Sequence, residues 1–491
     1  MMQYILTIDQ STTATKALMI DLDGNIIETV SKKHKQIYPQ KGWVEHNPNE
    51  IMNNVYLLLK KLIDRNEKKK DHIIALSITN QRETTIVWDR NTGLPVHNAI
   101  VWQCRRTSKH CEQLKEKEKI IAKKTGLKID PYFSATKIKW IFDTYNLEPE
   151  KYMFGTIDSW LIYNLTNRKM HVCDHTNASR TLLYNLKKKS WDQDLLDIFG
   201  ISMNILPVIK CSDDIFGYTT LNGQLKEIPI VGVIGDSQAS LFAQHCFEKG
   251  QTKATIGTGS SVLMNTGEKV LDNVFGIVNT LGWNLKKDKV YASEAIIHSS
   301  ADTLNWMRDQ LGLFKDDSEL NEICETYDAN GVIVVPAFVG LGNPYWLSDA
   351  KASIQGISRN TDKFNVICAG VESIAFQIYD AIEELMNMAN TIVPTIYIDG
   401  GGIQNPYLMQ LIADLCKSKV IINEEMLLSA LGSYYIAMLG LKLKDKSEIQ
   451  TMKKEVVTFT PSMDEKVRIE KINMWKNAIK TTVYSVKKAG N

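Results

Sequence analysis

Close cysteine pairs are missing from this chain of 491 residues: its eight cysteines are scattered, and none forms a CxxC arrangement. A disulfide framework and a zinc site are therefore disfavoured, and reduced thiols are expected. The nearest approach to a metal site is the group Cys104, His110 and Cys111, which lacks a fourth ligand at the usual spacing.

Long apolar runs and an excess of charge are missing as well. No apolar stretch approaches the roughly 20 residues that span a bilayer, and the first four residues lead straight into a strand-like segment without a charged leader. We therefore expect no membrane span, no secretory route and a cytoplasmic location. The formal net charge is only +2, so a nucleic acid is not expected as a partner.

The chain does contain apolar runs that alternate with segments of helical period, which predicts an α/β fold. The clearest helix is predicted over 365–388, where large apolar residues recur every three or four positions. Strands are predicted at 73–78, 86–88, 228–234 and 396–398.

The length of the chain is sufficient for two domains. In the segment 247–250, a helical run meets Gly250, a residue suited to end a helix. We therefore predict a first domain at residues 1–247 and a second domain at residues 248–491.

Each predicted domain opens with two strand-like segments joined by a short turn of small residues. The first turn is 9–13 (DQSTT) and the second is 257–261 (GTGSS). Such turns direct backbone N–H groups toward an anion, and glycines permit positive φ and close approach to a phosphate. One turn of this kind is more often only a turn. Two in matching places predict a nucleotide bound between two related halves.

Phosphoryl transfer needs a metal site, donors around the phosphates and a base near the attacking hydroxyl. Asp9 closes the first strand, where its carboxylate could hold Mg²⁺ through water, and Lys16 could reach the phosphates from the returning strand. The alternative is that Asp9 only starts a turn. The adjacent hydroxyls of Thr12 and Thr13 favour the metal role.

Asp236 follows the apolar segment 228–235 and precedes a helical run at 237–247. Its carboxylate would stand at the carboxyl end of a strand, where α/β folds usually bind ligands, and could accept the proton of a substrate hydroxyl. A plain helix N-cap is an equally good interpretation of this residue.

Arg82 and Glu83 stand between two predicted strands and could bind the hydroxyls of a polyol, with Arg donating and Glu accepting. A surface ion pair is the simpler interpretation of two adjacent opposite charges. Trp102 and Tyr132 could line a polyol site or belong to the core. The triple glycine at 400–402 could let the backbone pass close to adenosine, or form a flexible turn.

Several longer stretches resemble the FGGY carbohydrate kinases, of the actin, hexokinase and ribonuclease H-like ATPase group. The similarity runs nearly end to end and includes 42–46 (GWVEH), 79–85 (TNQRETT), 98–106 (NAIVWQCRR), 130–134 (DPYFS), 176–181 (TNASRT), 336–338 (PAF) and 399–401 (DGG). The resemblance implies two ribonuclease H-like domains with a cleft between them, which close over the substrates and exclude water. It also implies ATP-dependent phosphorylation of glycerol to sn-glycerol 3-phosphate. We further expect a homo-oligomer, either a dimer or a tetramer.

The same resemblance implies roles for individual residues, with Asp236 as the general base toward the terminal hydroxyl. The implied glycerol pocket consists of Arg82, Glu83, Trp102, Tyr132 and Asp236. The implied ATP contacts are Thr12, Thr13, Lys16, Thr258, Gly401 and Asn405, and Mg²⁺ would lie near Asp9 and Asp236.

Several positions depart from the family's pattern, and three of them concern the implied substrate and phosphate contacts. Ser261 stands where bacterial members usually have a phenylalanine that packs on the glycerol carbons, and Ser237 stands where glutamine is common. Lys16 replaces a usual arginine, which keeps the charge but loses the planar fork. The two serines leave open a kinase for another small polyol or sugar, such as erythritol, ribitol, xylitol or xylulose. An ATP-binding chaperone or filament protein of the actin-like group and a catalytically silent homologue are further alternatives.

Overall fold

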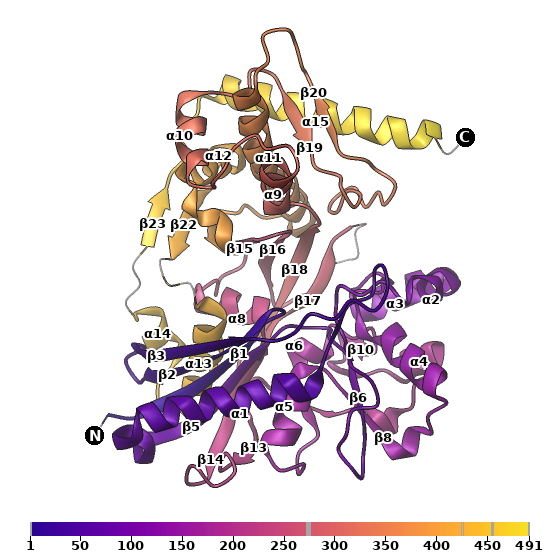
Figure 1. Cartoon of the computed structure of the whole chain (residues 1–491), viewed down its shortest axis with the longest axis vertical. Coiled ribbons are helices and arrows are strands. Elements are labelled where there is room, and N and C mark those ends of the chain that lie inside the picture. The colour runs from indigo at the N-terminus through magenta and orange to yellow at the C-terminus, as the bar shows by residue number, and fades with distance from the viewer. Residues whose placement is uncertain (1, 272–275, 424, 426, 453–455, 490–491) are drawn as a thin grey trace.

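The computed structural model describes residues 2–271, 276–423, 425, 427–452 and 456–489, and it has two lobes (Figure 1). Each lobe is built on a mixed β-sheet with helices packed against it. The predicted α/β class is therefore confirmed. None of the eight cysteines forms a disulfide bond, and no helix in the described part of the chain is both long and apolar enough to cross a membrane.

The sheet of the first half has six strands in the order β13-β14-β5-β1-β2-β3. Here β1, β5 and β14 run parallel, whereas β2, β3 and β13 are antiparallel to their neighbours. The strands are β1 (Tyr4–Gln10), β2 (Ala14–Asp21), β3 (Ile26–Lys33), β5 (Ile73–Asn80), β13 (Ile215–Thr219) and β14 (Ile228–Gly235).

The sheet of the second half repeats this plan with seven strands in the order β17-β18-β16-β15-β21-β22-β23. A hairpin again precedes two strands that run parallel to its first member. The strands are β15 (Thr252–Ile256), β16 (Ser260–Gly267), β17 (Val278–Asn284), β18 (Lys289–Ile297), β21 (Thr395–Asp399), β22 (Lys419–Asn423) and β23 (Val456–Phe459). The hairpins β1–β2 and β15–β16 thus hold the same place in two related sheets, as the two similar turns predicted.

Helices pack against both sheets. Those of eight residues or more are α1 (Pro48–Arg65), α3 (Glu118–Thr125), α4 (Ser134–Tyr145), α5 (Ile157–Leu165), α8 (Asp236–Ala243), α9 (Ala301–Asp309), α10 (Glu319–Thr326), α11 (Lys363–Ala389), α12 (Pro406–Cys416), α13 (Leu428–Gly440) and α15 (Glu465–Ala489). The shorter ones are α2 (Ser108–Gln113), α6 (His175–Ala178), α7 (Gln193–Phe199) and α14 (Lys446–Gln450).

Five two-stranded ribbons complete the set of described strands. They pair β4 (Glu45–His46) with β7 (Ala99–Ile100), β6 (Ile86–Asp89) with β8 (Tyr152–Gly155), β9 (Val172–Asp174) with β12 (Val208–Lys210), β10 (Tyr184–Asn185) with β11 (Ser190–Trp191), and β19 (Ile333–Val335) with β20 (Ser353–Gln355). The predicted strands correspond to β5, β6, β14 and β21, and the predicted helix to α11, which begins with a capping box between Asp362 and Asn365.

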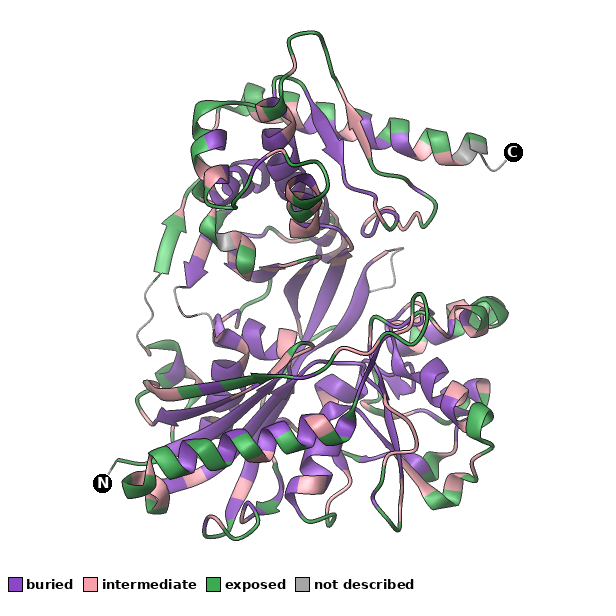
Figure 2. Cartoon of the chain, in the orientation of Figure 1, coloured by how far each residue is buried: buried purple, intermediate pink, exposed green. Residues whose placement is uncertain are grey.

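Alternate residues of the central strands face two different cores, because side chains alternate across a β-strand. Leu6 and Ile8 of β1 pack in a core with α1 and α5. Ile5 of the same strand packs in a second core with α8 and α13. The central strands are therefore buried on both faces (Figure 2).

Helix α13 comes from the second half of the sequence but packs on β1, β5 and β14 of the first sheet and on α8 (Figure 1). Two glycines make the close approach possible. A Cβ atom on Gly432 of α13 would overlap the backbone of Ala239, and one on Gly232 of β14 would overlap the backbone of Ser433. The division of the chain at residues 247 and 248 stays a prediction.

Candidate active site

A cavity of about 250 Å³ lies between elements of the two halves. The predicted site residues Asp9, Lys16, Asp236 and Ser237 all line it. The other lining residues are Ser11, Ser240, Lys253, Thr255, Asp399, Gly400, Leu428 and Ser429.

Asp236 is the first residue of α8 and directly follows the last residue of β14. The N-cap of this helix is Gly235, so the interpretation of Asp236 as a plain N-cap is wrong. The carboxylate accepts a hydrogen bond of 2.7 Å from the Ser237 N–H, and its side chain keeps 33% exposure. Arg82 Nε lies 3.4 Å from Asp236 Oδ1.

Buried hydrogen bonds hold the backbone just before Asp236. The Gly235 N–H donates to Thr176 Oγ1 at 2.9 Å, and that hydroxyl donates to Asp174 Oδ2 at 2.7 Å. Asp174 in turn caps α6 by accepting from the backbone N–H groups of Thr176 and Asn177. This network sets the direction in which Asp236 leaves the strand.

Asp9 is the penultimate residue of β1 and lies opposite Lys16 of β2, with 3.9 Å between Oδ2 and Nζ. Burial raises the pKa of Asp9 to about 6, with Lys16 opposing the shift and Asp236 adding to it. A divalent cation would relieve the crowding of these two carboxylates. No group of three or more potential metal ligands occurs among the described residues, so a Mg²⁺ ion here would need phosphate oxygens and waters as its other ligands.

Arg82 and Glu83 are buried, with 5% and 1% exposure, so the alternative of a surface ion pair is wrong. Arg82 Nη2 lies 3.0 Å from Glu294 Oε1, and Arg180 Nε donates to Glu83 Oε1 at 2.5 Å. Arg180 Nη1 also lies 2.7 Å from Glu294 Oε2. The four side chains therefore form a buried cluster of alternating charge, which we call the Arg–Glu cluster.

Charge is distributed unevenly within the Arg–Glu cluster. Burial raises the pKa of Glu83 in spite of Arg180 and Arg82. Burial would also raise the pKa of Glu294, but the same two arginines outweigh it and leave that pKa lowered. Glu83 also has a φ of 59°, a left-handed conformation that non-glycine residues rarely adopt and that is common at functional sites.

Trp102 and Tyr132 are half-buried, with ring centroids 5.3 Å apart. Trp102 Nε1 donates a hydrogen bond of 3.0 Å to Thr12 Oγ1. The aromatic pair is thus attached to the first hairpin, beside the Arg–Glu cluster, where the Arg180 Cζ atom lies 5.6 Å from the Tyr132 ring.

The second hairpin places Ser261 on the Arg–Glu cluster, since Ser261 Oγ donates to Glu294 Oε1 at 2.8 Å. Thr258 is exposed at the turn, as Thr13 is at the first turn. Neither Gly257 nor Gly259 uses the positive φ that glycine permits. Gly259 is required by close approach instead, because a Cβ atom there would lie 2.6 Å from the carbonyl oxygen of Ile297.

The triple glycine does not act as a single flexible turn. Cβ atoms on Gly400 and Gly402 would overlap Ile256, whereas one on Gly401 would meet nothing within 4 Å. Asn405 caps α12 by accepting from the Leu408 N–H at 2.9 Å, and its buried Nδ2 has no hydrogen-bond partner among the described residues. Gly401 and Asn405 therefore offer an open backbone and a free amide donor near one another in sequence.

Sequence reasoning missed three residues of this region: Arg180, Lys253 and Glu294. Arg180 lies in the segment 176–181 that carries part of the resemblance, and Lys253 is a charge in an otherwise uncharged strand. Those two signals could have identified them. Glu294 has no comparable signal in the sequence.

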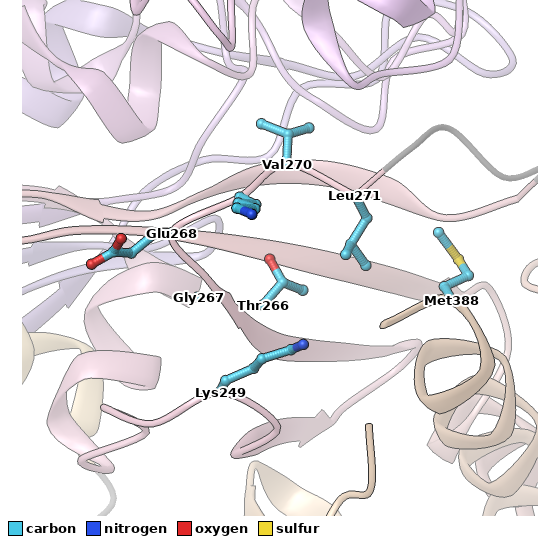
Figure 3. A pocket seen from close by; sticks show the side chains of 8 residues that line it. Lys249, Thr266, Gly267, Glu268, Val270, Leu271 and Met388 are labelled. Carbon is cyan, nitrogen blue, oxygen red and sulfur yellow. The ribbon is translucent and has the colours of Figure 1, made fainter. Parts of the chain in front are cut away.

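A larger hollow, of about 490 Å³, lies elsewhere in the second half (Figure 3). None of the predicted site residues lines it. Its lining consists of Lys249, Thr266, Gly267, Glu268, Lys269, Val270, Leu271 and Met388.

Two sheets of like topology, with carboxylates in a cavity lined by both halves of the chain, are typical of the two-domain ATPases of the ribonuclease H-like class. The particular family follows from comparison with known proteins. Residues 4–243 match the N-terminal domain, and residues 252–441 the C-terminal domain, of the FGGY family of carbohydrate kinases. The chain belongs to this family. The prediction of an enzyme is therefore confirmed over the alternatives of a chaperone, a filament protein and a silent homologue.

Several similar proteins of known activity are glycerol kinases. The chain is 45% identical to glycerol kinase 1 of Thermotoga maritima, over 97% of this chain and 99% of the relative. It is 42% identical to glycerol kinase of Bacillus subtilis, over 98% and 99%. The crystal structure of Plasmodium falciparum glycerol kinase with ADP aligns at a TM-score of 0.92 with 36% identity, over 98% of each chain. The predicted two-domain fold, the family and ATP-dependent transfer to an alcohol are therefore confirmed.

Proposed function

We propose that this kinase transfers the γ-phosphoryl group of ATP to a terminal hydroxyl of glycerol, giving sn-glycerol 3-phosphate. The observation that carries the reaction type is the presence of Asp9 and Asp236 in one cavity lined by both halves of the chain. The acceptor is proposed from the relatives, which are glycerol kinases matched over nearly their whole length.

Asp236 is the proposed base, because its carboxylate is partly exposed at the carboxyl end of β14 and faces the cavity. It accepts the proton of the attacking hydroxyl. Arg82 donates to the polyol's hydroxyls and Glu83 accepts from them, while Trp102 and Tyr132 pack against its carbons. Ser237, whose N–H donates to Asp236, and Ser261, which donates to Glu294 of the Arg–Glu cluster, complete the pocket.

The proposed nucleotide contacts come from both hairpins and from the triple glycine. Backbone and hydroxyl groups of the two turns hold the phosphates, with Lys16 adding charge. Gly401 and Asn405 lie against the adenosine. The residues at the turns are Thr12, Thr13 and Thr258.

The carboxylates of Asp9 and Asp236 are the residues that would hold Mg²⁺. When bound, the ion would neutralise negative charge on the phosphates during transfer. A homo-oligomer, dimer or tetramer, and a cytoplasmic location also stay predictions, which light scattering and cell fractionation would check.

Asp236→Asn tests the base. We expect phosphoryl transfer to be lost, measured as polyol-dependent ADP release, while ATP binding measured by calorimetry stays within about threefold, since a neutral amide cannot accept the proton. Asp64→Asn, the same change at a surface ion pair on α1, is the control. Near-normal turnover of Asp236→Asn would remove Asp236 from the role of base.

A second acceptor class is favoured by one observation. Ser261 places a small hydroxyl side chain against Glu294 where a larger apolar residue would fill the same wall. A longer polyol or a sugar would then fit. Initial rates with glycerol, erythritol, ribitol, xylitol and xylulose decide between the two, and no turnover of glycerol would contradict the leading proposal.

A further inference from the structure

Lys253 lies in β15, the strand that leads into the second hairpin. Its side chain lines the 250 Å³ cavity although the residue is only 1% exposed. Side chains alternate across a strand, so Lys253 and Thr255 face the cavity while Ala254 and Ile256 pack in the core of the second half. The ammonium group of this second-half residue therefore faces the cavity that the carboxylates of Asp9 and Asp236 also line.

This ammonium group forms no ion pair in the part of the chain that the structure describes, although three carboxylates line the same cavity. No carboxylate there lies within 4.0 Å of it, and it makes no hydrogen bond there. Two basic side chains buried to a similar extent do have partners: Arg180 donates to Glu83, and Lys137 donates to the carbonyl oxygen of Tyr132. Lys253 is thus unusual for a buried cation.

The three carboxylates that line the cavity are already paired with other groups. Asp9 faces Lys16, and Asp236 faces Arg82. Asp399 Oδ2 accepts from Ser240 Oγ at 2.5 Å and from Gln244 Nε2 at 2.7 Å. Lys253 is therefore available to bind an anion that enters the cavity.

We propose that Lys253 binds the phosphoryl group in transit, by donating a hydrogen bond to a non-bridging oxygen of the γ-phosphate of ATP. The inference rests on the proposed function, because it places phosphoryl transfer in this cavity. A buried cation without a partner is unfavourable in the free protein and favourable once an anion arrives. Such a group stabilises the transition state, in which charge develops on the phosphoryl oxygens.

Lys253 keeps its proton throughout the transfer. The acceptor's hydroxyl oxygen forms a bond to the γ-phosphorus, and the bond from that phosphorus to the β–γ bridging oxygen breaks. The electron pair of the broken bond leaves with ADP, and the proton of the hydroxyl passes to Asp236. Lys253 donates to the same phosphoryl group before and after transfer.

The test compares Lys253→Met with Lys253→Arg and with Lys249→Met, a control at an exposed lysine outside the cavity. For Lys253→Met we expect kcat to fall about 100-fold, the magnitude typical of one lost charge-stabilising donor, with KM for the polyol unchanged within threefold. ATP affinity should fall about tenfold, while AMP affinity stays the same, because AMP lacks the γ-phosphate. Lys253→Arg should recover part of kcat, and Lys249→Met should match the unmodified protein.

Thermal unfolding separates this role from a structural one. Without nucleotide, Lys253→Met should melt at the same or a higher temperature, because it removes a buried charge that has no ion-pair partner among the described residues. A lower melting temperature together with equal loss of ATP and AMP binding would overturn the inference, as would unchanged kcat and ATP affinity. Nucleotide binding is measured without polyol, so a failure of glycerol as acceptor does not decide this point.

Discussion

Arg82 and Glu294 are separated by 212 residues in the sequence, yet Arg82 Nη2 lies 3.0 Å from Glu294 Oε1. Both side chains are buried, and they come from different halves of the chain. The proposed polyol pocket of the first half is therefore held in part by strand β18 of the second. Domain association and pocket geometry depend on the same ion pair.

Glu294→Gln should destabilise the protein, because it leaves Arg82 and Arg180 with Glu83 as the one carboxylate of the Arg–Glu cluster. Breaking a buried pair typically costs about 3–5 kcal/mol, which urea unfolding at equilibrium would measure. Glu268→Gln, at an exposed glutamate, should change stability by less than about 0.5 kcal/mol. Since the pKa of Glu294 is lowered, its stabilisation should be present above its ordinary pKa of 4.5 and decline in stronger acid. Equal stability of the two variants would contradict a structural ion pair here.

Ser261→Phe should shift selectivity toward glycerol. The ring would occupy the wall where Ser261 Oγ now contacts Glu294, and less room would remain for a fourth or fifth carbon. We expect the ratio of kcat/KM for erythritol to that for glycerol to fall about tenfold or more, by exclusion of one or two methylene-sized groups. Ser261→Ala removes the hydroxyl without filling the space and is the control; the same ratio in both variants would show that side-chain size at this position does not select the acceptor.

Gly401→Ala and Gly402→Ala differ by one position and should behave differently. A methyl group on Gly401 meets nothing within 4 Å, so the free energy of unfolding should stay within about 0.5 kcal/mol, while affinity for AMP falls if adenosine packs there. A methyl group on Gly402 would overlap Ile256 and should destabilise by about 1–3 kcal/mol. Urea unfolding and calorimetric titration with AMP measure both effects. Unchanged AMP affinity in Gly401→Ala would place adenosine elsewhere.

Asp380→Asn should change how stability depends on pH. Asp380 Oδ2 accepts hydrogen bonds from Tyr345 at 2.8 Å and from Trp475 at 2.7 Å, and burial raises its pKa to about 7 from an ordinary 3.8 in spite of them. Between these values the unfolded chain releases a proton that the folded protein keeps, so stability falls as the pH rises through this window and levels off above it.

The asparagine variant does not titrate at this position. Its stability relative to the unmodified protein should therefore increase from pH 4 to pH 7 and then stay constant, as measured by urea unfolding at each pH. A difference that is the same at every pH would show that Asp380 ionises normally in the folded state.

Local sequence patterns were sufficient for the elements that carry the site. The apolar run at 228–235 and the period of 365–388 correspond to β14 and α11, because strand and helix periods are local properties. The two hairpins were recognisable for the same reason. The reason for the glycine at position 259 could not be recognised in the same way. Gly259 is needed because Ile297, 38 residues later in the sequence, passes close to it, and no local pattern indicates that approach.

The sequence by itself determined the α/β class, the paired hairpins and the positions of Asp9, Asp236, Arg82 and Glu83, because these follow from short-range periodicity and from motifs of the family. Only the tertiary structure decided that Arg82 and Glu83 are buried and paired with Glu294 and Arg180. It also decided that α13 packs on the first sheet and that Lys253 faces the cavity without a partner among the described residues. The physical reason is that charge compensation and close packing depend on groups far apart in the sequence, which the chain brings together only when both sheets have formed.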